Sequence, residues 1–255
     1  PMTAGRTVLK YSNVFVDGYD LTGYSRTFGP LTWSMGEAET TTIGDAVKNA
    51  LPDVATVNVG AISAILDNTT GASHDRLNGQ GTRTIMIPIG GRAAPAQGDP
   101  TFMGVFMQKE FATVASIGSA VTLSANFSGW AGEATSLLYG NPWGRLLAAK
   151  SARTTINSAI GIDDYGAATA KGGYMCYQLF TSNGTVNMKV QDAATNTDVS
   201  FADLAASGLV TAAVTPTAGI VALSPTATVR RYLRWQMTLG TATTATFAIA
   251  FVRAF

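Results

Sequence analysis

Apolar and polar residues alternate with a period of two along much of this chain, and this alternation restricts the fold more than any other feature. Between residues 229 and 239 one face carries Arg231 and five apolar residues: Val229, Leu233, Trp235, Met237 and Leu239. Successive side chains of a strand point to opposite faces of a sheet, so the pattern predicts a half-buried strand. The alternation returns at Phe247, Ile249 and Phe251 after the linker 240–244. We predict that the two strands form an antiparallel hairpin.

Further strands are predicted where Thr, Val, Ile and aromatic residues gather between Gly, Pro, Asn and Asp. Their ranges are 7–16, 31–36, 54–66, 84–90, 101–113, 119–127, 174–180, 186–190, 209–214 and 219–223. One short helix is predicted near 42–51, because Ile43, Val47 and Leu51 follow helical spacing and Pro52 ends it. Composition becomes loop-like over 128–173, which places a domain boundary near 145. The predicted fold is mainly β, with a first β domain at 1–145 and a C-terminal β-sandwich at 146–255.

The composition argues against most enzyme classes. The chain has one His and one Cys, the residues that most often supply acid–base or nucleophilic chemistry near neutral pH. Cys176 lies in an apolar run and is predicted to be buried. Net charge is +1 with 13% charged residues, so no overall field gathers nucleic acid or an anionic membrane. No apolar run reaches the roughly 18 residues of a membrane span, and no export leader is recognised, so we expect a soluble structural or binding protein.

Two arrangements of acidic residues could in principle supply acid–base chemistry. His74 stands beside Asp75 in a polar stretch, where a solvated loop histidine is favoured over a catalytic dyad. Glu37 and Glu39 project to one side of a predicted strand, as paired acids would, but exposed strands often carry such pairs. We predict no catalytic residue, no cofactor-binding residue and no metal ligand.

Two loop patterns are also only weak indications of a binding site. Asp163-Asp164 before Tyr165-Gly166 is typical of a turn, with a hard-cation site as the alternative. Gly79-Gln80-Gly81 lacks the further glycine, lysine and helix start of a phosphate loop.

Aromatic and basic residues raise two binding hypotheses. Arg230, Tyr232 and Arg234 share a strand face that can contact phosphate, although a solvated or intersubunit face is favoured because the chain is not basic. Stacking on tryptophan suggests a glycan-binding module as a second hypothesis. Trp235 is predicted to lie in the core; the other candidates are Trp33, Trp130 and Trp143.

Two N-terminal motifs carry a family resemblance. The stretch Val16 to Tyr24 (VDGYDLTGY) is followed by Glu39 to Lys48 (ETTTIGDAVK), by Leu51-Pro52-Asp53 and by a strand that ends near Leu66-Asp67. This order resembles the major tail tube proteins of tailed bacteriophages. The C-terminal stretches 186–192, 201–204 and 229–253 also resemble a β domain found in phage structural proteins. Together these motifs cover about half of the chain.

The resemblance implies a virion protein whose subunits form rings, typically hexameric, that stack into a tail tube for DNA ejection. Its partners would be other copies of itself, the tail terminator, the tape measure and the distal tail protein. Double-stranded DNA would pass through the tube without sequence-specific binding. Assembly would occur in the host cytoplasm. Either the loop 93–100 or a long strand pair would contact the next ring. A capsid decoration protein is the alternative, and a glycan-binding adhesion module ranks below it.

Overall fold

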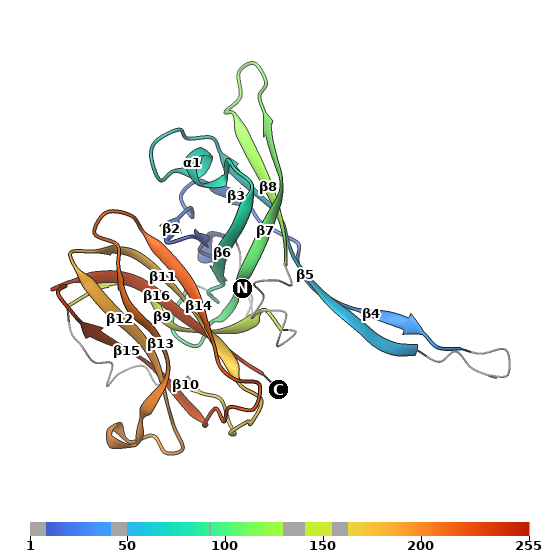
Figure 1. Ribbon diagram of the computed structural model, residues 1–255. Helices are drawn as coiled ribbons and strands as arrows, with labels where there is room; N and C mark the ends of the chain where they lie inside the picture. The colour runs from blue at the N-terminus through green and yellow to red at the C-terminus, as the bar shows by residue number, and fades with distance from the viewer. Residues whose placement is uncertain (1–8, 42–49, 92, 130–140, 155–162, 255) are drawn as a thin grey trace, which may run out of the picture.

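The computed structural model describes residues 9–41, 50–91, 93–129, 141–154 and 163–254, and these form a mainly β protein with one short helix (Figure 1). The predicted fold class is therefore confirmed. Its larger elements are β4 (Leu31–Glu39), β5 (Ala50–Ile65), α1 (Ser73–Leu77), β6 (Gly81–Pro88), β7 (Pro100–Val114), β8 (Thr122–Gly129), β9 (Trp143–Arg153), β11 (Gly173–Ser182), β12 (Thr185–Ala193), β13 (Ala202–Thr211), β14 (Thr217–Ala222), β15 (Tyr232–Leu239) and β16 (Ala245–Arg253). The short strands are β1 (Phe15–Val16), β2 (Tyr19–Asp20), β3 (Ser25–Thr27) and β10 (Asp163–Asp164), and 3-10 turns lie at Leu9–Tyr11 and Asp198–Ser200.

A sheet of 12 strands curls into a nearly closed barrel. Its main path runs β14-β11-β16-β9-β7-β6-β1-β2, and β3, β4, β5 and β8 branch from it. The inward side chains form a buried core; its members include Phe15, Met86, Met103, Leu146, Tyr174, Cys176, Ala248 and Val252. Cys176 is fully buried, as predicted. The barrel core therefore combines residues from both ends of the chain.

The second sheet has four strands in the order β10-β15-β12-β13, and it packs against β9, β11 and β16. Trp235 of β15 meets Phe247 of β16 edge-on at 5.5 Å between ring centroids. Val229, Leu233 and Met237 are buried between the two sheets, so the predicted alternation is confirmed. The predicted hairpin is wrong, because β15 pairs with β12 and β10 whereas β16 pairs with β11 and β9. The linker crosses from one sheet to the other, and the two apolar faces meet by packing instead of backbone pairing.

The strands β11 and β16 are buried on both faces. One face of β16 contributes Phe247, Ile249 and Phe251 to the core between the sheets, while Ala248 and Ala250 line the barrel. Alternating large and small side chains allow both faces to pack closely. The two strands thus hold barrel and sandwich together.

The N-terminal half has its own core on the outer side of β6, β7 and β8, covered by α1 and the segment 14–31. Most of the predicted helix 42–51 lies outside the described residues, and its last two positions begin β5. Strand pairing with β4 fixes these two residues as extended. The predicted strand 7–16 is also shorter than expected: residues 9–11 form a 3-10 turn, and β1 covers only Phe15–Val16.

The predicted domain boundary falls inside β9, which pairs with β7 on one side and β16 on the other. The large sheet therefore runs without a break past residue 145. The division into 1–145 and 146–255 remains a prediction about independent folding.

Candidate functional site

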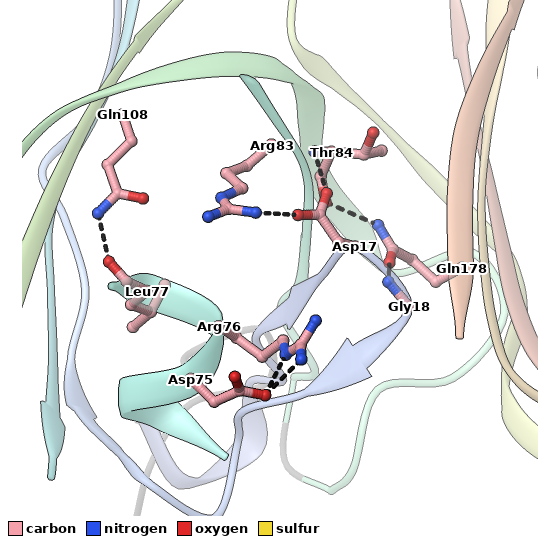
Figure 2. Close-up of polar contacts among 9 residues, drawn as sticks. All are labelled: Asp17, Gly18, Asp75, Arg76, Leu77, Arg83, Thr84, Gln108 and Gln178. Carbon is pink, nitrogen blue, oxygen red and sulfur yellow. Dashed lines mark hydrogen bonds and ion pairs between the residues drawn. The ribbon is translucent and has the colours of Figure 1, made fainter. Parts of the chain in front are cut away.

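The candidate catalytic residues are held in ordinary structural contacts. Asp75 accepts a hydrogen bond from the Gly71 backbone at 2.7 Å. It also accepts one from Arg76 Nε at 2.8 Å (Figure 2). These bonds lower the pKa of the Asp75 carboxyl, the Gly71 bond most. His74 lies in α1 and packs its ring against Phe111, with centroids 5.8 Å apart. Within the described ranges no three His, Cys, Asp or Glu residues gather as a metal site would require.

Asp163 and Asp164 form the short strand β10, where a turn was predicted. Arg231 binds the Asp164 carboxylate with both Nε and Nη2, at 2.8 and 2.7 Å. This bidentate bond, together with the Gly166 backbone, lowers the pKa of Asp164 to about 2. Arg231, the exception to the apolar pattern, therefore turns out to be an ion-pair partner that sequence reasoning missed.

Arg230, Tyr232 and Arg234 do not form an open phosphate site. Arg234 is only 4% exposed; its guanidinium pairs with Asp198, binds Gln191 Oε1 at 2.9 Å, and lies over the Phe201 ring. Arg230 pairs more loosely with Asp192, at 3.9 Å. Arg234 is therefore held in contacts within the chain, and the solvated face favoured from the sequence does not describe it, whereas Arg230 remains partly exposed.

The tryptophans do not form one stacking surface. Trp235 is in the core, as predicted. Trp143 is half-buried and meets Phe102 edge-on at 5.2 Å between centroids. Trp130 lies outside the described residues. Trp33 remains, 47% exposed on β4, a strand that pairs only with β5 among the described strands.

The most unusual feature is an arm made of β4 and the first half of β5, which projects from the body (Figure 1). Residues 50–57 of β5 pair only with β4 among the described strands, whereas residues 58–65 also pair with β8. Nine residues of β4 reach about 30 Å at ~3.4 Å each. Trp33, Ser34, Glu37 and Glu39 are exposed along it. An isolated two-stranded ribbon is marginally stable in water, so this arm is poorly supported by its own chain.

The loop 93–100, the other predicted contact, is tied to the body. Gly98 donates to the Leu146 carbonyl at 2.8 Å, and Leu146 donates to the Asp99 carbonyl at 2.9 Å. Pro95 is buried. The long strand pair, and not this loop, is therefore the element that reaches outward.

A polar seam of Gly18, Thr84 and Gln178 closes the barrel (Figure 2). Gln178 is fully buried; its Oε1 accepts from the Gly18 backbone at 2.6 Å and its Nε2 donates to the Thr84 carbonyl at 3.1 Å. Gly18 has φ +83°, and a Cβ there would lie 2.6 Å from the Thr217 nitrogen, so only glycine fits. Next to the seam, burial raises the pKa of Asp17, opposed by its bonds to Thr84 and Arg83. The polar groups of the seam, and Asp17 beside it, thus hold β11 to β6 and to the turn between β1 and β2.

No known protein family matches the sequence, and no curated protein matches it. Among solved structures, one similar chain is the SPP1 Dit protein, described as a paradigm of the hub adsorption apparatus in phages that infect Gram-positive bacteria. The match covers 94% of this chain and 98% of that chain, with 13% identity and a TM-score of 0.33. The described part of the chain contains no helix with the length and hydrophobicity that a membrane crossing requires. The feature of this chain with most bearing on function is thus its projecting arm.

Proposed function

We propose that this chain is a structural protein of a phage virion, without enzymatic activity, and that it acts as the tail tube subunit. In this role its copies form rings, of six subunits by the family resemblance, which stack into the conduit for DNA. Other tail proteins would bind the ends of the stack. The proposal combines the sequence resemblance with one structural observation, the projecting arm.

The arm supports assembly because the described part of the chain leaves it uncovered. Both edges of the ribbon 31–39 and 50–57 lack a further strand among the described residues. Unpaired edges are normally blocked or covered in proteins that act as monomers. The exposed Trp33 adds an aromatic of the kind enriched at the centre of interfaces. A neighbouring copy would supply the missing cover.

Low charge is compatible with a conduit. Net charge is +1, so the chain as a whole has little hold on phosphates, and gripping them would slow DNA transit. A capsid protein would share this property, so charge does not separate the two roles.

The test is negative-stain electron microscopy of the whole chain over a concentration series. Truncation near residue 150 is unsuitable, because it would remove β11 and β16 and uncover the barrel core. Stacked six-fold rings are expected. Single rings that never stack would instead favour a hub at the tail tip, and monomers or trimers would favour a capsid decoration protein.

A pair of matched variants tests the arm. Trp33→Asp places a charge on the arm, whereas Val199→Asp places one at a 96% exposed position on the body. Losing an aromatic interface anchor costs about 1–2 kcal/mol or more, so W33D is expected to raise the concentration needed for rings about tenfold. V199D should assemble like the parent protein. Equal behaviour of the two variants would refute a role for the arm.

A further inference from the structure

A second unpaired edge lies on β7. The strand pairs with β6 only as far as Gln108, which faces Gly81, and it continues to Val114 with β8 on its other side. Before Gly81 the chain turns away into α1. Residues 109–114 therefore have no strand on the β6 side within the described chain. Lys109, Thr113 and Val114 are exposed, so this edge is open to an added strand.

A crevice of about 230 Å³ lies where this edge begins, between residues 78–80 and residues 108–111. Gln108 lines it and is 5% exposed. Its Nε2 donates to the Leu77 carbonyl at 2.5 Å, but its Oε1 is buried without a hydrogen-bond partner. Figure 2 shows that oxygen turned away from Leu77. Buried acceptors are nearly always satisfied by protein or by ordered water, and among the described residues no donor reaches this oxygen.

The charges near the two open edges are complementary. Lys109 forms no ion pair with any described residue, and the same holds for Glu37 and Glu39 on β4. Glu110 is already engaged, because it accepts from Asn126 Nδ2 at 2.5 Å. The outer edge of β4 is nine residues long and exceeds the six residues of the β7 edge.

We propose that the outer edge of β4 from one copy adds to the β7 edge 109–114 of a second copy, with Lys109 facing Glu37 or Glu39. This inference deepens the proposed function and rests on it, since it names the surface that receives the arm. Because the two edges differ, the contact is heterologous, and repeating it produces a ring where the rotation between copies closes and an open chain where it does not. Backbone pairing supplies affinity, and the ion pair supplies register.

The first experiment is zero-length carbodiimide cross-linking of the assembled full chain, prepared from mixed ¹⁴N and ¹⁵N protein. Mixed-isotope cross-links from Lys109 to Glu37 or Glu39 are expected. Assembled rings that lack these cross-links would overturn the inference while leaving the tail tube proposal standing. Dimers or open chains that carry the cross-links would support the inference and refute the tube.

The second experiment reverses the charges. Lys109→Glu is expected to raise the concentration needed for assembly about fivefold, the scale of one exposed ion pair turned repulsive. The triple variant E37K/E39K/K109E should restore assembly. Lys171→Glu, at an exposed position on the other half of the chain, is the matched control and should have no effect. An unchanged K109E, a triple variant that does not recover, or a protein that stays monomeric throughout would each overturn the inference.

Discussion

Replacing Gln178 with leucine would test whether the polar seam holds the barrel closed. The side chain is fully buried and links β11 to the turn between β1 and β2 and to β6. Leucine has a similar volume, so most of the packing is kept. The variant therefore removes two hydrogen bonds while leaving the surrounding shape nearly intact.

Loss of the hydrogen bond costs the Gly18 N–H more free energy than it costs the Thr84 carbonyl. The Thr84 carbonyl still accepts from the Asp17 backbone at 3.0 Å, so it remains satisfied. The Gly18 N–H loses its acceptor at 2.6 Å. A buried donor without a partner costs about 1–3 kcal/mol. We therefore expect Q178L to lower the free energy of unfolding by about 1–3 kcal/mol, nearly all of it from Gly18.

Urea unfolding followed by tryptophan fluorescence measures this loss, with Gln97→Leu as the control at an exposed glutamine. The control should change the free energy of unfolding by less than about 0.5 kcal/mol. A Q178L protein as stable as the control would refute the argument that these hydrogen bonds hold the barrel closed.

Three further measurements test burial, charge and exposure. Cys176 should react with thiol reagents only as fast as the protein unfolds, because the thiol is fully buried and burial raises its pKa; rapid labelling of native protein would contradict this. Asp164 has a pKa of about 2 in the folded protein against an ordinary 3.8. As the pH falls, the unfolded state therefore binds the proton first, and the stability contributed by the ionised Asp164 carboxylate is lost between about pH 4 and pH 2. Asp164→Asn should flatten that part of a stability-against-pH curve. In hydrogen exchange, residues 31–39 should exchange quickly in isolated subunits and slowly in assemblies, whereas β16 should stay protected in both.

The sequence located several strands that bury one face. Strand β15, Tyr232–Leu239, is one of them, and the alternation over 229–239 identified its buried side correctly. Its neighbour was predicted wrongly, because periodicity reports which side is buried and carries no information about which strand lies beside it. The linker 240–244 is long enough for either a hairpin or a crossing between sheets.

The strand β9 was missed for a different physical reason. It runs between the two cores, so Leu146 faces the barrel while Leu147 and Ala148 face the sandwich. Burial on both sides removes the alternation, and the segment then resembles a loop in composition. The open edge of β7 was likewise beyond sequence reasoning, because it depends on where β6 ends relative to its partner.

The strands of the body and the strands of the arm differ in whether their edges are paired. In β11 and β16 both faces are packed and both edges are paired, so the hydrogen bonds of these strands are closed to solvent and to other chains. In β4 and residues 109–114 of β7 one edge is open and most side chains are exposed. The nearly closed barrel does not use these open edges to build its own core. They are the edges that the proposed pairing between copies would cover.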